Sequence, residues 1–309
     1  MRFSIVIPSY NYARYLPRAL ESALAQPGDD YDVTVIDDGS SDDTAGVVRP
    51  YLQAHGDKLK YVYQDNRGLA GARNRGIDET EGDYLLFLDA DDRLLPRALQ
   101  VFRDFLAAAP ETDLVTAGHI SVDPRGRRKR RPVRVLGREP ARNFAAFIHR
   151  KISLTNGATV FHRRIFDTVR YPESLRQNED LVVNGLALAR FRCASVPEAV
   201  LEVHAHEGRM RHDMDTIVSS GLAVVDLLFD ADLLPAPLMK YRSTFLSRYL
   251  LSKFRSYYQA GYYKEANRLY GFALRERPVH VFLYSYLKKY LRSLAFATLG
   301  KGRKYEPSG

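Results

Sequence analysis

The chain has 309 residues, of which 45% are hydrophobic and 27% are charged. This composition excludes a disordered, collagen-like or disulfide-scaffold chain. The single cysteine, Cys193, excludes an internal disulfide and a thiolate zinc site. No segment approaches the roughly 18 uninterrupted apolar residues that a membrane-spanning helix needs, so we expect no membrane-spanning helix. The net charge of +9 is uneven, because residues 238–309 carry +12 and the remainder carries −3.

The first 120 residues alternate between two hydrophobic patterns. Short apolar runs predict buried strands, and longer segments with apolar residues three or four apart predict helices. The expected strands are 3–7, 33–36, 60–64, 84–88 and 113–116. The expected helices are 17–26, 69–79 and 96–108. A further helix, capped by Asp42 or Asp43, is expected to run towards His55. Strands separated by such helices predict an α/β fold, with a parallel sheet covered on both faces.

The pattern becomes irregular after Gly118. The stretch Arg125–Arg142 holds nine basic residues and one acidic residue. Two interpretations stay open: a solvated hairpin, or a flap beside an acceptor site that attracts phosphorylated or acidic glycans. Short helices are expected at 143–149 and 181–189, and mostly helical structure is expected from Asp215 onwards.

Polar side chains follow three of the predicted strands. The strand 84–88 is followed by Asp89, Asp91 and Asp92, and the strand 33–36 by Asp37 and Asp38. Ligands of open α/β sheets bind beyond the carboxyl ends of the strands. Carboxylate oxygens there suit Mg²⁺ or Mn²⁺, although acids at such a position also cap helices.

The first strand ends in Pro8-Ser9-Tyr10-Asn11, whose ring and amide are suited to flank a nucleobase. Together with Asp37-Asp38-Gly39-Ser40-Ser41-Asp42, the segment Asn66–Asn74 and the Asp89-Ala90-Asp91 motif, it closely resembles the family 2 glycosyltransferases of the GT-A fold. The four motifs occur in order over roughly residues 3–92. The resemblance implies a mixed sheet flanked by helices, with a helical C-terminal region. It also implies inverting transfer from a nucleotide-diphosphate sugar, with a metal ion, Mn²⁺ or Mg²⁺, bridging the diphosphate.

The resemblance also implies roles for individual residues. Donor-binding residues are Pro8, Tyr10, Asn11, Asp38, Arg73, Asn74 and Asp89, with Pro8, Tyr10 and Asp38 lining the nucleoside pocket. Asp89 contacts the ribose or the metal, and Asp91 ligates the metal. Asp92 is either a helix cap or an acid behind the metal ligands.

Downstream, Glu179-Asp180 matches the acidic pair of the family at the start of a helix. Inverting displacement needs one base for the acceptor hydroxyl proton, and Asp180 is our choice, with Glu179 orienting it or the acceptor. An acidic first helical turn favoured by the helix dipole is the alternative. Of His204 and His206, His206 fits the family pattern better as a further metal ligand.

Processive members of the family carry a Q-x-x-R-W motif and membrane spans, whereas this chain has no tryptophan. We therefore expect single-sugar transfer to a glycan or lipid-linked acceptor, in bacterial cell-envelope polysaccharide or lipopolysaccharide synthesis. The expected organisation is a glycosyltransferase domain at 1–214, with a nucleotide-sugar half at about 1–120 and an acceptor half at about 121–214. A basic, aromatic-rich helical region follows at 215–309.

The C-terminal region predicts an amphipathic helix over Val281–Leu299. A helical wheel puts Leu283, Tyr286, Leu287, Tyr290 and Leu294 on a packing face and Lys288, Lys289 and Arg292 opposite, with Phe282 and Phe296 at the border. The basic face suits an anionic membrane surface, or keeps the protein soluble as a solvated cap. We expect a cytoplasmic protein, with peripheral attachment to the inner face of the cytoplasmic membrane as an option.

No nucleic acid partner is expected, because the carboxylates of the N-terminal part lie where phosphates would have to bind unless a metal intervenes. The alternative function is a non-enzymatic module that binds nucleic acid or anionic surfaces through the basic C-terminal region.

Overall fold

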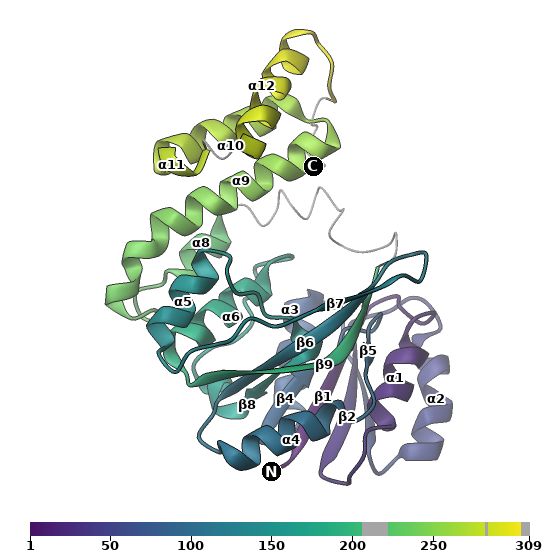
Figure 1. Cartoon of the computed structure of the whole chain (residues 1–309). Helices are drawn as coiled ribbons and strands as arrows, with labels where there is room; N and C mark the ends of the chain where they lie inside the picture. The colour runs from purple at the N-terminus through teal and green to yellow at the C-terminus, as the bar shows by residue number, and fades with distance from the viewer. Residues whose placement is uncertain (206–221, 282–283, 304–309) are drawn as a thin grey trace. The chain divides into compact units, whose positions relative to one another are not determined.

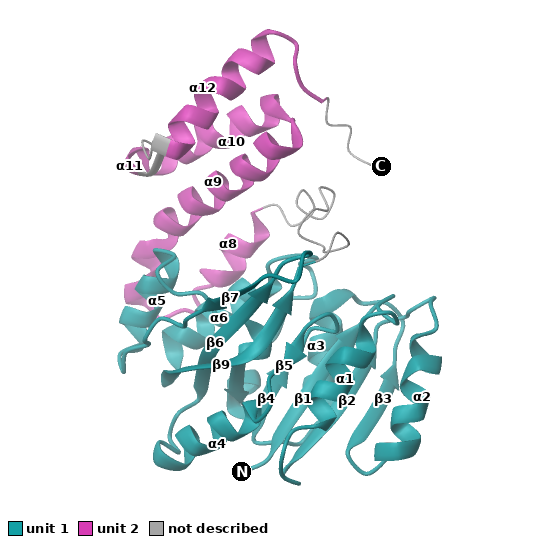
Figure 2. Cartoon of the chain, turned by 45° about the vertical axis from the view of Figure 1, so that its right-hand side comes forward, with its two compact units in different colours: residues 1–212 teal, residues 213–309 magenta. Residues whose placement is uncertain are grey.

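The computed structural model describes residues 1–205, 222–281 and 284–303. The chain divides into two compact units, Met1–His212 and Asp213–Gly309 (Figure 2). A sheet with helices makes up the first unit, and the second is helical.

Four parallel strands form one half of the sheet (Figure 1). They are β1 (Phe3–Ser9), β2 (Tyr31–Asp37), β3 (Leu59–Tyr63) and β4 (Tyr84–Phe87), in the order β3-β2-β1-β4. They are connected by helices α1 (Leu16–Leu24), α2 (Thr44–His55) and α3 (Gly68–Asp78). The predicted alternation of strands and helices is therefore confirmed in this half.

Strand β1 is central because it is apolar on both faces. All seven of its residues are buried, and Phe3, Ile5 and Ile7 share a core cluster with α1. Val6 lies on the other face, against α3. There a Cβ on Gly76 would lie 2.2 Å from Val6 Cγ1, so glycine permits the close approach of helix and strand.

The other half of the sheet is mixed in direction. Strand β8 (Thr159–His162) is antiparallel to β4 and to β6 (Leu114–Val122), and β9 (Cys193–His204) runs parallel to β6. The short β5 (Arg93–Leu94) pairs with β9, and β7 (Arg128–Arg131) pairs with β6. The mixed GT-A-type sheet is thus confirmed, whereas the wholly parallel sheet that periodicity predicts is wrong for this half.

Helices and turns complete the first unit. They are α4 (Ala98–Ala108), α5 (Pro140–Ile148), α6 (Glu179–Arg190) and the 3-10 turns η1 (Asn156–Ala158) and η2 (Arg163–Asp167). Strand β6 extends well past the expected end at Thr116. Its pairing with β9 is irregular at Ala117 and Gly118, opposite a segment of β9 that contains Pro197.

The C-terminal unit is helical, as expected from the sequence. Its described elements are α8 (Ala223–Leu228), η4 (Ala236–Tyr241), α9 (Arg242–Ala260), α10 (Tyr263–Glu276), α11 (Pro278–Val281) and α12 (Tyr284–Thr298). In the part of the chain that the structure describes, none of the helices combines the length and apolar character that a membrane crossing requires.

The packing face of α12 agrees with the helical-wheel prediction at Tyr286 and Tyr290 and differs from it at Leu294. Tyr290 stacks on Tyr270 with ring centroids 4.0 Å apart, Ser293 is fully buried, and the Phe296 ring lies 5.1 Å from that of Tyr263. Leu294, predicted to pack, is 37% exposed, and Leu291 is 57% exposed. The rings of Tyr286, Tyr290 and Phe296 therefore pack against α9 and α10, whereas Leu291 and Leu294 lie outward. Phe282 and Leu283 lie outside the described residues.

Candidate active site

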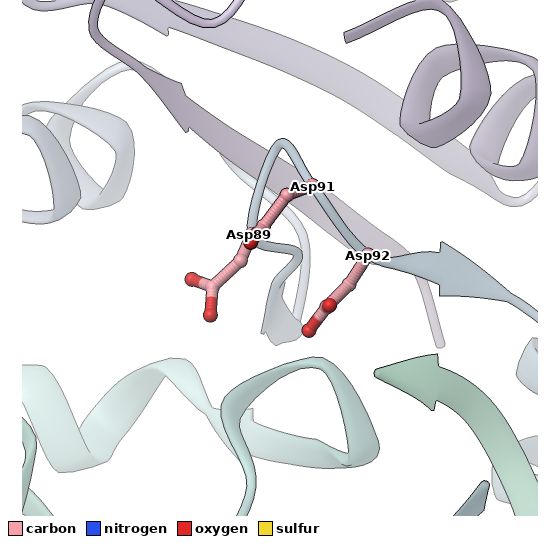
Figure 3. A group of neighbouring side chains, drawn as sticks. All are labelled: Asp89, Asp91 and Asp92. Carbon is pink, nitrogen blue, oxygen red and sulfur yellow. The ribbon is translucent and has the colours of Figure 1, made fainter. Parts of the chain in front are cut away.

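The acidic motif forms one tight turn at the carboxyl end of β4. Figure 3 shows the side chains of Asp89, Asp91 and Asp92 leaving this turn. Each offers one carboxylate oxygen, and the three oxygens lie within 4.8 Å of one another. The Asp92 amide donates to the Asp89 carbonyl at 3.0 Å, which closes the turn, and Asp91 and Asp92 are buried. The predicted metal-site acids therefore converge.

Two neighbouring elements hold this turn in place. The guanidinium of Arg18, on α1, donates to the Asp91 carbonyl, and the backbone amide of His204, at the end of β9, donates to Asp92 Oδ1 at 3.1 Å. The His204 ring lies beside Glu202, with Nε2 3.5 Å from a Glu202 oxygen. Burial lowers the pKa of His204. His206, the predicted metal ligand, lies outside the described residues.

Arg73 connects the acidic turn to the start of α6. Its guanidinium donates to Glu179 Oε1 at 2.6 Å and to Asp89 Oδ1 at 3.1 Å, and it lies 5.3 Å from the centroid of the Tyr171 ring. Arg73 is buried. Burial alone would lower its pKa, but the charges of Glu179 and Asp89 raise it. Arg73 is therefore a fixed positive charge between two carboxylates.

The two acids that begin α6 differ in environment. Glu179 is buried against Arg73. Burial raises the pKa of the Glu179 carboxyl, and the positive charge of the Arg73 guanidinium acts in the opposite direction. Asp180 is half-buried, and its charge contributes to the raised pKa values of Arg73 and Tyr171. Asn178, just before them, has φ +65°, in the left-handed region. This turn leaves Asp180 partly accessible beside an acid that is already paired.

Asp38 lies where β1 and β2 end side by side. Its amide donates to the Ser9 carbonyl at 2.9 Å, and its carboxylate accepts from Gln64 Nε2 at 2.6 Å and from the Arg67 amide at 2.8 Å. Burial nevertheless raises its pKa. The next residue, Gly39, has φ +79°, and a Cβ there would lie 2.9 Å from the Asn66 nitrogen, so this turn needs glycine.

The remaining predicted donor residues fall into two groups. Pro8 is buried in β1, and Tyr10, just beyond, is exposed. Asn11 and Asn74 use their amides to hold backbone: Asn11 Oδ1 accepts from the Ser41 amide at 2.8 Å, and Asn74 exchanges hydrogen bonds with the Tyr171 backbone at 2.8 and 3.0 Å. Their contacts in this structure are with loops around the site.

Sequence reasoning missed Arg18, Tyr171 and Glu173. Glu173 accepts three hydrogen bonds from Arg67 and one from Asn74, which ties the segment before α6 to α3. No periodicity marks these residues, because they lie in irregular chain or on an ordinary amphipathic helix. Only the tertiary arrangement reveals them.

Comparison with known proteins identifies the family. The family model described as glycosyl transferase family 2 matches residues 4–170. The succinoglycan biosynthesis protein ExoO of Rhizobium meliloti is 31% identical over 305 residues, which cover 95% of this chain and 79% of ExoO. Other curated relatives match over shorter segments, one of them over 40% of its own length.

Solved structures share the fold. The structure of S. aureus TarS in complex with UDP-GlcNAc superimposes with a TM-score of 0.67 at 18% identity, covering 99% of this chain and 94% of that one. The mannosyltransferase PcManGT from Pyrobaculum calidifontis, in complex with GDP-Man and Mn²⁺, gives a TM-score of 0.60 at 17% identity, covering 97% and 86%.

The first unit has a fold of the GT-A type, with an acidic turn at the carboxyl end of β4. The chain belongs to the family 2 glycosyltransferases and is a glycosyltransferase. The predicted family, fold and glycosyl-transfer function are thereby confirmed. Family membership favours an enzyme over the alternative of a non-enzymatic binding module.

Proposed function

We propose that the protein transfers one sugar, with inversion, from a nucleotide-diphosphate sugar to a hydroxyl of a glycan or lipid-linked acceptor. The observation that carries this proposal is the grouping of the acidic turn, the Arg73–Glu179 pair and Asp180. The succinoglycan biosynthesis protein among the relatives supports a place in bacterial cell-envelope polysaccharide or lipopolysaccharide synthesis.

The acidic turn fits a divalent cation. Three carboxylates with oxygens within 4.8 Å of one another repel each other and form a hard oxygen donor set, which suits Mn²⁺ or Mg²⁺. Asp91 and Asp89 would hold the ion, with Asp92 beside them. The chemistry that a bound ion would supply there is positive charge, which would stabilise the diphosphate and the leaving nucleotide.

The nucleoside side of the donor lies at the ends of β1 and β2 in this proposal. Pro8 and Tyr10 line the nucleoside pocket, and Asp38 accepts hydrogen bonds from the base or ribose. Asn11 and Asn74 act through the loops they hold. Arg73 keeps Asp89 in position, because its hydrogen bond to Glu179 fixes the guanidinium.

Asp180 takes the proton from the acceptor hydroxyl. One base is enough for an inverting displacement, since the attacking oxygen loses its proton as it bonds to the anomeric carbon. Glu179 is a positioning residue: its carboxylate is held by Arg73, and it fixes the first turn of α6 from which Asp180 projects.

Turnover of an Asp180→Asn variant tests this assignment. Nucleotide release is measured with the nucleotide sugar that binds best, first with water and then with a membrane glycolipid extract as acceptor. We expect kcat to fall roughly 10²–10⁴-fold, with donor affinity unchanged. The exposed Asp57→Asn variant is the matched control. Normal turnover with lost donor affinity would overturn the role of Asp180, and no turnover of any nucleotide sugar by the wild type would overturn the proposed function.

We further propose that the C-terminal unit contacts an anionic membrane surface at the inner face of the cytoplasmic membrane, where a lipid-linked acceptor lies. The net charge of +12 over residues 238–309 supports this. On α12, Lys288 and Arg292 are exposed together with Leu291 and Leu294. Basic residues next to exposed leucines are typical of helices that lie in a lipid interface.

A further inference from the structure

A small basic pocket lies in the first unit, outside the residues described above. It has a volume of about 200 Å³ and is lined by β6, by the end of β7 and by the segment that follows α5. Four of its lining residues are permanently cationic, namely Arg131, Arg134, Arg150 and Lys151, and His119 joins them. None of the described residues that line it is acidic.

Neighbouring basic residues have carboxylate partners, whereas most of the pocket cations do not. Arg127 pairs with Asp123 at 2.6 Å, and Arg128 pairs with the buried Glu202. Within the described chain, Arg131, Arg134 and Lys151 take part in no ion pair with an acidic side chain. Like charges around one hollow repel each other and focus a positive potential into it, and an anion there relieves the repulsion.

The backbone at the pocket is also unusual. Arg150 has φ +56°, a left-handed conformation that glycine normally supplies after a helix. This conformation follows the end of α5 at Ile148 and brings Arg150 and Lys151 to the pocket. A long charged side chain in place of glycine strains the backbone, and strain of this kind gathers at ligand sites. The other non-glycine residues in this conformation include Asn11 and Asn178, which adjoin the candidate active site.

Strand register places the pocket near the acidic turn. His119 on β6 lies opposite Leu201 on β9, and Leu201 lies opposite Leu94 on β5, which is two residues after Asp92. Neighbouring strands lie about 4.8 Å apart, so His119 is roughly 10 Å from Leu94 across the sheet. The pocket is therefore within reach of a substrate whose reacting group is at the acidic turn.

We propose that this pocket is an anion subsite for the acceptor, which holds a carboxylate or phosphate group carried by the acceptor glycan. This inference rests on the proposed function. The pocket is smaller than the ~300–1,000 Å³ of sites that enclose a whole small molecule, so it takes one charged substituent or sugar. Guanidinium groups bind both oxyanions through paired charge-assisted hydrogen bonds.

Paired sugars test the subsite directly by ligand-observed NMR on the full chain, with chelator present and no donor. The pairs are methyl β-D-glucuronide against methyl β-D-glucoside, and glucose 6-phosphate against glucose. We expect the acidic member of at least one pair to bind at least tenfold more tightly, and binding to weaken with salt. The preferred pair identifies carboxylate or phosphate. Equal binding within both pairs would overturn the proposal without involving any variant.

An Arg134→Ala/Lys151→Ala variant localises the binding. It should lose roughly ten- to hundredfold in affinity for the acidic sugar. The matched control is Arg49→Ala/Lys60→Ala, which removes the same charges from α2 and from β3 at the far end of the sheet order. Equal affinity of the two double variants would contradict the assignment.

Nucleotide-sugar binding with Mn²⁺, measured on the same wild-type preparation without chelator, separates this proposal from the proposed function. Binding of a nucleotide sugar without discrimination between acidic and neutral sugars would overturn the subsite alone. Discrimination between acidic and neutral sugars without binding of any nucleotide sugar would overturn the proposed function alone.

Discussion

Replacement of Arg73 by methionine tests the charge network that holds the candidate active site together. The variant keeps a long side chain in the buried volume, but leaves Glu179 in the interior without its counter-charge, 2.6 Å from where the guanidinium was. Breaking a buried pair in this way costs roughly 3–5 kcal/mol. For a unit of this size each kcal/mol lowers Tm by roughly 2–4 °C, so we expect Tm to fall by about 6–20 °C.

The loss should depend on pH. Burial raises the pKa of Glu179 above its ordinary value of 4.5, so the folded state binds more protons than the unfolded state. Stability contributed by this group is therefore present below about pH 4.5 and falls as the pH rises through the folded-state pKa. Without Arg73 that pKa rises further. The deficit of Arg73→Met relative to the wild type should be larger at pH 8 than at pH 5.5.

Differential scanning calorimetry at both pH values, with the double variant Arg73→Met/Glu179→Gln, measures the coupling. Glutamine removes the buried charge, so the double variant should recover part of the loss, with a coupling energy of roughly 1–3 kcal/mol. Additive losses from the two single variants, or a deficit that does not change with pH, would refute the reasoning.

Four other variants probe the metal site, the membrane contact and the packing of two helices. Asp91→Asn should abolish the Mn²⁺ dependence of donor binding while keeping or raising Tm, because one of three clustered charges is removed; full metal-dependent binding in calorimetric titration would contradict the metal site. Lys288→Glu/Lys289→Glu/Arg292→Glu should lose salt-sensitive co-sedimentation with anionic liposomes, and equal recovery of wild type and variant would argue against the membrane contact. Gly76→Ala should lower the free energy of unfolding by roughly 1–3 kcal/mol, because its Cβ meets Val6. Gly271→Ala, in α10 with open space around it, should raise the free energy of unfolding by up to about 1 kcal/mol. A urea titration that ranks the two variants the other way would contradict the packing.

Much of the N-terminal half could be predicted from the sequence, because the local pattern and the fold agree there. The β1 segment Phe3–Ser9 is short, apolar and buried on both faces, which is the pattern of a central parallel strand. Asp38 and the Asp89–Asp92 turn follow such strands directly, so their placement at one edge of the sheet follows from strand direction. The motif spacing then points to one family.

The other half could not be predicted in the same way, because its pairing is non-local. Strand β8 is antiparallel between β4 and β6, and no periodicity encodes direction. Strand β9 is interrupted by Pro197 and an irregular register opposite Gly118, so its sequence does not resemble one continuous strand. The predicted face of α12 was right at Tyr290, which stacks on Tyr270, and wrong at Leu294, which is exposed while its polar neighbour Ser293 is buried.

The same contrast holds within the candidate site. Arg73 was expected to lie near the donor, but its burial between Glu179 and Asp89 is a tertiary fact, since these residues are far apart in sequence. The pairing of Asn74 with the Tyr171 backbone is likewise invisible in a motif. The motifs therefore predict which residues gather at the candidate site, and the structure separates those whose side chains hold backbone, such as Asn74, from those that stay exposed, such as Tyr10.

A thermal-shift screen of UDP-, GDP- and dTDP-sugars tests the central claim most directly, with Mn²⁺ or with chelator, on the wild type and on Asp91→Asn. A ligand at 100 times its Kd stabilises the folded state by about 2.7 kcal/mol, which is roughly 5–11 °C in Tm for a protein of this size. We predict a shift of this order for at least one nucleotide sugar with Mn²⁺, and little or none with chelator or in Asp91→Asn. No shift with any nucleotide sugar, or equal shifts under all these conditions, would contradict the account.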